Sequence, residues 1–167
     1  MSLAQGVLAG GLALAGLAAP WPLDAATSSS FQVSATVSTG CLVVGGGSNY
    51  GTLNFGSWSA LATGTATAAV PGTGVTLQCT PGVTLNMKVD GGQNAGTSRN
   101  LKAGSALLAY QLYRDAAYSQ SLGISQSVTV AYADSTNISL PIYGRLSLPG
   151  NLPAGSYSDV LQVELSW

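Results

Sequence analysis

Two cysteines are the residues whose type and spacing point most directly to chemistry. Cys41 and Cys79 are the only cysteines in the chain, and the loop they would close holds 39 residues counting both ends. In a secreted chain two cysteines predict a disulfide, which would stabilise the fold by about 4 kcal/mol in a loop-entropy description. Two free buried thiols are the alternative. Metal binding is less favoured, because the chain has no histidine and no C-x-x-C pair.

Residues that could perform catalysis are scarce. Without histidine, no Ser-His or Cys-His pair can form. After the first 25 residues the acidic side chains are Asp90, Asp115, Asp134, Asp159 and Glu164. Asp90 precedes two glycines and is typical of a turn, and any pair of carboxylates would have to meet through the fold. The glycine-rich stretch 45–51 lacks the Lys-Ser/Thr ending of a phosphate loop. We therefore predict neither enzyme activity nor a cofactor.

The beginning of the chain resembles a secretory signal peptide. A polar start is followed by an apolar run, Val7–Ala19, and then by a Pro-Trp-Pro break and small residues. Cleavage after Ala25 or Ala26 is predicted. A membrane span is the alternative, but the run is shorter than the ~20 residues needed to cross a bilayer. The start contains no Lys or Arg, which departs from the usual pattern and leaves the true start codon open.

The low charge of the chain argues against a nucleic-acid partner. Charged residues make up 7 % of the sequence, against about 25 % in ordinary domains. Beyond the leader five basic residues face five acidic ones, so no basic patch is available for nucleic acid. A chain with so little charge repels copies of itself weakly, which suits a packed assembly.

Short apolar–polar alternations after the leader predict an all-β protein. They lie between clusters of Gly, Pro, Asn and Ser, and no long stretch has helical periodicity. The predicted strands are 51–58, 75–80, 83–90, 106–115, 127–132, 137–147 and 155–167. A Pro-Gly turn signal between the second and third predicts that they form a hairpin. About seven strands in one domain indicate a β-sandwich.

One further strand candidate, residues 31–37, has no evident partner. Its alternate residues share one apolar face of an extended chain: Phe31, Val33, Ala35 and Val37. No tight turn connects it to a following strand. The segment pairs either as a first strand within its own domain or with another molecule.

Aromatic residues offer a possible sugar-binding surface: Trp58, Tyr110, Tyr113 and Tyr143. Strand aromatics more often fill a sandwich core, so we predict that Tyr110 and Tyr143 are core residues. Trp58 lies in a Ser-rich segment, which favours exposure.

Eight short pieces, in order along the chain, resemble the spore coat protein U domain and, within that family, the Csu-type subunits of archaic chaperone–usher pili. They are VSTGC (37–41), YGTLNFG (50–56), LQCTPG (77–82), VDGG (89–92), RNLK (99–102), LLAYQLYRDAA (107–117), LPIYGRL (140–146) and PAGSYSDVLQVELSW (153–167). Each piece alone is weak, but eight in order are specific. An N-terminal extension before a single domain looks most similar to a major rod subunit.

The resemblance implies an incomplete immunoglobulin-like β-sandwich that a donated strand completes. In such subunits one strand is missing, which leaves an apolar groove beside the terminal strand. A periplasmic chaperone fills the groove first, and the N-terminal strand of the next subunit then replaces it. The implied division is a signal peptide (1–25), a donor-strand extension (26–38) and a pilin domain (39–167).

The resemblance also assigns roles to particular residues. The donor residues would be Phe31, Val33, Ala35 and Val37. The acceptor groove would be lined from the terminal strand by Leu161, Val163, Leu165 and Trp167. The alternative for the latter set is an ordinary buried face of an edge strand.

The implied function is structural: a secreted pilus subunit that polymerises by donor-strand complementation into surface fibres for adhesion and biofilm formation. The implied partners are copies of the chain itself, a periplasmic chaperone, an outer-membrane usher and other pilus subunits. The chain would pass through the periplasm to a cell-surface fimbrium. A minor or tip-proximal subunit that binds a surface or glycan is the second hypothesis, and a stand-alone coat protein with a self-complemented fold is the third.

Overall fold

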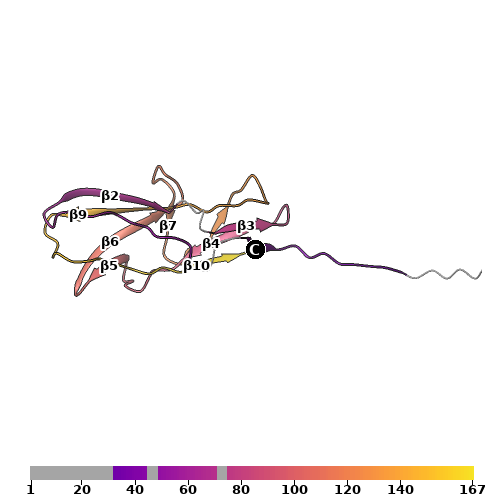
Figure 1. Cartoon of the computed structure of the whole chain (residues 1–167), viewed down its shortest axis with the longest axis horizontal. Coiled ribbons are helices and arrows are strands. Elements are labelled where there is room, and N and C mark those ends of the chain that lie inside the picture. The colour runs from indigo at the N-terminus through magenta and orange to yellow at the C-terminus, as the bar shows by residue number, and fades with distance from the viewer. Residues whose placement is uncertain (1–31, 45–48, 71–74) are drawn as a thin grey trace, which may run out of the picture. The chain divides into compact units, whose positions relative to one another are not determined.

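The computed structural model describes residues 32–44, 49–70 and 75–167, and the chain divides into two units. The first unit, 1–36, is described only from Gln32, and those residues are exposed and form no strand. The second unit, Val37–Trp167, contains every described strand (Figure 1). The predicted signal peptide and Phe31 lie outside the described residues.

All regular secondary structure in the described part of the chain is β-strand. The strands are β1 (Cys41–Val44), β2 (Thr63–Val70), β3 (Thr76–Cys79), β4 (Leu85–Val89), β5 (Arg99–Ala103), β6 (Ala106–Tyr113), β7 (Ser121–Leu122), β8 (Val128–Val130), β9 (Ile142–Pro149) and β10 (Val163–Ser166). Within residues 32–44, 49–70 and 75–167, no helix has the length and apolar character that a membrane crossing requires.

The largest sheet is antiparallel and has the order β2-β9-β6-β5, with β7 added beside β6. Strands β6 and β9 alternate between buried and more exposed residues, as expected for strands with one face on a core. Leu112 and Leu146 are among the buried residues. In Figure 1 the four main strands follow one another in this order.

Two smaller sheets complete the domain. One has the order β10-β4-β8, and the other pairs β1 with β3. Side chains from all three sheets meet in one apolar cluster, for example Leu77 of β3, Leu85 of β4 and Leu146 of β9. This all-β architecture with open sheet edges agrees with the predicted incomplete immunoglobulin-like β-sandwich.

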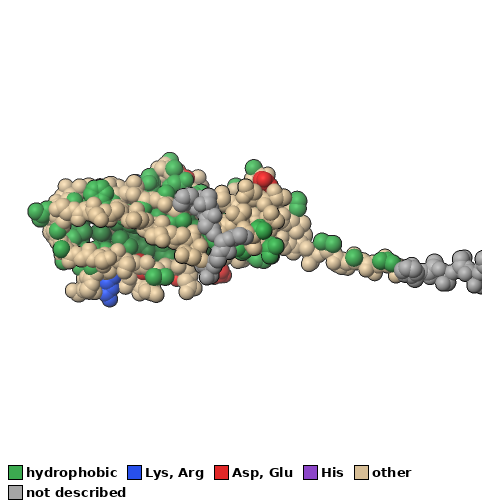
Figure 2. All heavy atoms as spheres, in the orientation of Figure 1, with side chains coloured by type: hydrophobic (Ala, Val, Ile, Leu, Met, Phe, Trp, Pro, Cys, Tyr) green, Lys and Arg blue, Asp and Glu red, His purple; other side chains and the backbone are tan. Residues whose placement is uncertain are grey.

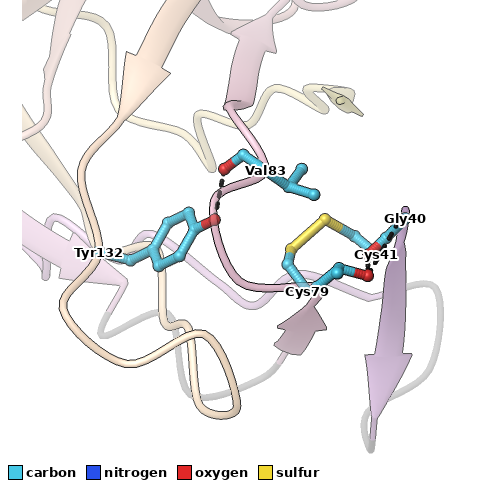
Figure 3. The surroundings of a disulfide bond; sticks show 6 residues. Gly40, Cys41, Cys79, Val83 and Tyr132 are labelled. Atoms are coloured by element: carbon cyan, nitrogen blue, oxygen red, sulfur yellow. Dashed lines mark hydrogen bonds between the residues drawn. A yellow bond between two sulfur atoms is a disulfide. The ribbon is translucent and has the colours of Figure 1, made fainter. Parts of the chain in front are cut away.

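The disulfide expected between Cys41 and Cys79 is present and joins β1 to β3 (Figure 3). The two residues are direct cross-strand partners. Beside them, Thr80 N–H donates to the Gly40 carbonyl at 2.9 Å, and Gly40 N–H donates to the Thr80 hydroxyl oxygen at 3.2 Å. The Tyr132 hydroxyl donates to the Val83 carbonyl just beyond the bond (Figure 3). The disulfide therefore fixes the point where the N-terminal segment joins the domain.

The predicted hairpin of 75–80 and 83–90 is wrong, although its turn is present. Val83 N–H donates to the Thr80 carbonyl at 3.2 Å, and Gly82 has a φ of +84°, as position i+2 of a type II turn requires. The chain nevertheless passes from one sheet to another at this turn, because β3 pairs with β1 whereas β4 pairs with β8 and β10. A turn signal reports a reversal and does not identify the partner strand.

Other strand predictions differ from the structure at the groove described below. Residues 51–58, predicted as a strand, form none, and only the last part of 155–167 does. Conversely, β2 was not predicted, because its Thr, Ala and Gly residues give a weak apolar signal. Eight register pairs with β9 place Ala66 and Val70 in the buried layer.

Candidate functional site

An apolar groove of about 740 Å³ opens between two extended segments that are distant in sequence. One wall is the C-terminal segment from Asp159 to Leu165, and the other is the segment from Tyr50 to Phe55. Apolar side chains of β4, β6 and β9 form its floor: Val89, Tyr110, Leu112 and Ile142. Figure 2 shows hydrophobic side chains gathered in a hollow on this face of the domain.

Three of the four residues predicted to line a groove do line this one. Leu161, Val163 and Leu165 face it and are partly buried, while the residues between them are exposed. This alternation follows from the period of two along an extended chain. Trp167 is not among the lining residues; its side chain is 58 % exposed and lies beside Gly40.

The backbone beside the groove lacks a partner strand on both walls. Among the described strands, β10 pairs only with β4, so its other edge is open. Residues 50–57 make no backbone–backbone hydrogen bond with any other described residue. Unpaired N–H and C=O groups along an edge are a template for another strand. Three groups of the 50–57 wall bond to side chains instead: Gly51 N–H donates to Asn49 Oδ1, Gly56 N–H donates to Asn54 Oδ1, and the Phe55 carbonyl accepts from Trp58 Nε1. The groove therefore combines an apolar floor with two backbone edges that lack a partner strand.

A glycine of β9 makes room for one wall of the groove. A Cβ placed on Gly144 would lie 2.5 Å from Leu53 Cδ2 and 2.8 Å from Phe55 Cζ. The absence of a side chain at this β9 position allows both wall residues to pack down on the large sheet, where Phe55 meets Tyr110 edge-to-face at 6.1 Å.

Asp159 holds the other wall in place at one end of the groove. Its Oδ1 accepts hydrogen bonds from the backbone N–H and the Nδ2 of Asn94, at 3.2 and 3.1 Å. Its Oδ2 accepts the hydroxyl of Tyr110 at 2.8 Å. Burial raises the pKa of Tyr110 far above its usual value, and the bond to Asp159 raises it further. The phenol therefore stays protonated and donates at any physiological pH.

A buried arginine secures the loop that Asp159 contacts. Arg99 is 3 % exposed and donates to the carbonyls of four residues at 2.6 to 3.1 Å: Val89, Asp90, Leu122 and Gly123. Burial lowers the pKa of its guanidinium, and nearby Tyr110, Asp90 and Asp159 oppose that shift. These bonds fix the end of β4, next to which the groove wall is attached.

We expect Gly92→Ala to destabilise the domain, because Gly92 lies against the carboxylate of Asp159. A Cβ there would be 2.1 Å from Asp159 Oδ2, and the backbone has a φ of +82°. The expected loss in unfolding free energy is about 2 kcal/mol or more, the sum of a left-handed backbone and a displaced carboxylate. Urea denaturation measures it.

The matched control is Gly82→Ala, since Gly82 has a φ of +84° and open space around its Cβ position. This variant should lose only the backbone part, about 1 kcal/mol. Equal losses in the two variants would show that contact with Asp159 contributes nothing.

The predicted donor residues that the structure describes are exposed. Val33 and Val37 are 80 % and 91 % exposed, and Ala35 is exposed as well. No described residue from Gln32 to Gly40 belongs to a strand. The alternative of a first strand within the same domain therefore finds no support in these residues.

The aromatic residues proposed for sugar binding are mostly packed. Tyr110 belongs to the buried apolar cluster, as predicted, and Tyr113 is buried as well. The prediction that Tyr143 is a core residue is wrong, because it is only partly buried and lies outside that cluster. Tyr118 contacts both Tyr113 and Tyr143 edge-to-face, and Arg145 lies over the Tyr113 ring at 5.1 Å. Trp58 is 56 % exposed, as its Ser-rich surroundings indicated.

Sequence reasoning overlooked several groove residues. Leu53 and Phe55 lie in the predicted strand 51–58, and their alternation is the sequence signal that could have identified them as wall residues. Tyr110 was predicted as core but also forms part of the floor. Asp159 lies two residues before Leu161 and therefore on the same face of an extended chain, so a carboxylate in an apolar row is the sequence signal that could have identified it.

Two solved structures resemble the fold at low sequence identity. A chain in the chaperone–tip adhesion subunit pre-assembly complex CsuC-CsuE, from archaic chaperone-usher Csu pili of Acinetobacter baumannii, is 18 % identical with a TM-score of 0.44 over 79 % of this chain and 40 % of that chain. A chain in a chaperone–tip adhesin complex of CFA/I fimbriae biogenesis is 16 % identical with a TM-score of 0.42, over 69 % of this chain and 38 % of that one. This chain thus spans less than half the length of either.

No curated protein matches the sequence significantly. The family described as the Spore Coat Protein U domain matches residues 27–164. That range includes the floor of the groove, the wall from Tyr50 to Phe55, the other wall except Leu165, the disulfide and most of the N-terminal extension. The chain therefore belongs to the Spore Coat Protein U domain family.

Proposed function

We propose that this chain is a structural pilus subunit of a chaperone–usher system, and that it polymerises by donating its N-terminal segment to the groove of a neighbouring copy. The observation that carries the proposal is the groove itself: an apolar floor between two backbone edges that lack a partner strand. An added strand satisfies such edges, while its alternate side chains enter the apolar space.

The exposed N-terminal segment supports the same reading. Its alternate residues are apolar, and those described are exposed to solvent. Burial of Phe31, Val33 and Val37 in a neighbour would contribute about 1.5–3 kcal/mol each before ordering costs. Because the donor and the groove belong to different copies, the contact is head-to-tail and does not close, so it builds a fibre.

The groove also explains why residues 51–58 form no strand in a single copy. An isolated edge segment has no partner for its backbone groups, and the donated strand would supply one between it and β10. The proposed division is a cleaved leader (1–25), a donor extension (26–38) and an acceptor domain (39–167).

The proposed partners follow from the open groove. A periplasmic chaperone covers it before assembly, an outer-membrane usher accepts the complex, and copies of the chain or other pilus subunits fill it in the fibre. The chain would act at the cell surface, in adhesion and biofilm formation, without catalysing a reaction. The resemblance to a major rod subunit favours a place in the fibre shaft.

A chain without residues 26–37 should bind its chaperone but form no fibres when expressed with its chaperone and usher. It keeps an acceptor groove and lacks a donor. Electron microscopy of the cells and pull-down of the chaperone measure the two properties.

Point variants provide a matched control. Val33→Ser with Val37→Ser should abolish fibres, whereas Gln32→Ser with Thr36→Ser, on the opposite face of the segment, should not. Fibres from the deleted chain, or equal assembly of both double variants, would contradict the proposal.

A further inference from the structure

The apolar groove ends at a carboxylate. Asp159 lines it at the level of Tyr110, and Leu161, Val163 and Leu165 follow along the same wall. The three hydrogen bonds that Asp159 accepts leave one of its roughly four acceptor positions free. An apolar donor side chain placed there would remove water from this position without replacing the hydrogen bond, which is unfavourable.

The backbone of the wall defines which residues face an incoming strand. Asp90 N–H donates to the Gln162 carbonyl at 3.1 Å, and Gln162 N–H donates to Asp90 Oδ1 at 2.9 Å. Gln162 thus bonds toward β4. Because successive residues of an extended chain direct their backbone groups to opposite edges, Leu161 and Val163 direct theirs to the open edge.

The ends of the domain indicate the direction of the incoming strand. The N-terminal segment joins the domain at Gly40. A Cβ placed on Gly40 would lie 3.7 Å from Trp167 Nε1. The donor segment therefore leaves its own copy at the C-terminal end of the β10 wall. In a fibre of like-oriented copies it enters its neighbour at the opposite end, where Asp159 lies. Its chain direction is then antiparallel to β10.

We propose that Asp159 is a register stop: it receives Thr39 of the neighbouring copy and thereby fixes which donor residue meets which wall residue. This rests on the proposed function. In the antiparallel register, Thr39 lies opposite Asp159, and the next three inward-facing residues meet Leu161, Val163 and Leu165. They are, in that order, Val37, Ala35 and Val33. The hydroxyl of Thr39, which is exposed in its own copy, donates to the free acceptor position.

The neighbouring registers are less favourable. A slip of two residues in one direction places Val37 against the carboxylate. A slip of two residues in the other direction would place Cys41 opposite Asp159, but the disulfide holds Cys41 in its own domain. A slip of one residue turns the apolar face of the donor toward solvent. A donor strand parallel to β10, with Phe31, Val33 and Ala35 facing Leu161, Val163 and Leu165, would instead place Ser29 opposite Asp159.

Cysteine cross-linking tests the register. The full chain carries a second copy of residues 26–39 behind Trp167, joined by a flexible linker and called the fused copy. Gln162→Cys is combined in turn with Gln32→Cys, Ser34→Cys or Thr36→Cys in the fused copy. Gln162 is exposed and alternates with Leu161 and Val163, and the three positions in the fused copy lie on the face opposite Val33, Ala35 and Val37, so the apolar contacts are kept.

We expect only Thr36→Cys to cross-link efficiently to position 162. Opposed residues in a non-hydrogen-bonded pair lie about 4.5 Å apart between Cα atoms, within the range of a disulfide. Diagonal residues lie about 7–8 Å apart, so their yield should be at least about ten times lower. Preferential cross-linking of Ser34→Cys would indicate the slipped register, and of Gln32→Cys the parallel one; either result overturns the proposal.

A second measurement addresses Asp159 directly. In the fused copy, Thr39→Val should lower the melting temperature by about 3–5 °C, Thr39→Ser should leave it unchanged, and Ser29→Val should have no effect. An unchanged melting temperature for Thr39→Val in a chain that the fused copy does stabilise would overturn the register stop alone. A fused copy that gives no stabilisation would overturn the proposed function together with it.

Discussion

The chain with a fused copy of residues 26–39 behind Trp167 will be a monomer with a melting temperature at least about 10 °C above that of the unfused chain. The fused copy fills the groove from within the same molecule. Burial of three large apolar side chains contributes about 4.5–9 kcal/mol, from which the entropic cost of ordering the segment must be subtracted. A net gain of about 3 kcal/mol corresponds to this shift, at roughly 3–4 °C per kcal/mol for a domain of this size.

Calorimetry measures the melting temperature, and light scattering measures whether the chain is a monomer. The matched control is a fused copy with Val33→Asp and Val37→Asp, which keeps the length and the linker but cannot enter an apolar groove. It should leave stability and association at the level of the unfused chain. A stabilisation equal to that of the unchanged copy would mean that the linker, not strand insertion, is responsible.

Removal of the disulfide by Cys41→Ala with Cys79→Ala should lower the unfolding free energy by about 4 kcal/mol. The bond closes a loop between residues separated by 38 positions, and loss of that restriction favours the unfolded chain. Cys79 is also buried, so its sulfur contributes to packing. Urea denaturation of the fused-copy chain, with and without both cysteines, measures the difference.

A reductant separates the covalent effect from packing. The reductant should lower the urea midpoint of the parent chain toward that of the double variant, and it should leave the urea midpoint of the variant unchanged. Equal midpoints for parent and variant under oxidising conditions would show that the bond does not stabilise the domain.

The position of the disulfide is relevant to the proposed assembly. The disulfide joins β1 to β3 beside Gly40, so it stabilises the point from which the N-terminal segment departs. Force along a fibre would be applied at this point. In the proposed fibre, the groove would hold one end of the donor segment and the disulfide would secure the other.

The sequence by itself determined the features that depend on local pattern. Alternation in 106–115 and 137–147 identified the strands that became β6 and β9, because a strand with one buried face must alternate with period two. The cysteine pair predicted the disulfide, and the ordered motifs identified the family. The face shared by Leu161, Val163 and Leu165 was visible for the same reason as the strands.

Only the tertiary structure decided which segments become neighbours. It separated β3 from β4 despite the turn between them, and it formed β2 from weak strand formers through pairing with β9. It brought Leu53 and Phe55 to face the C-terminal segment, clamped Asp159 to Tyr110 and left Trp167 beside Gly40, outside the groove. Periodicity specifies which side of a strand is apolar, whereas a groove is a concavity between segments far apart in the chain, and that depends on non-local pairing and packing.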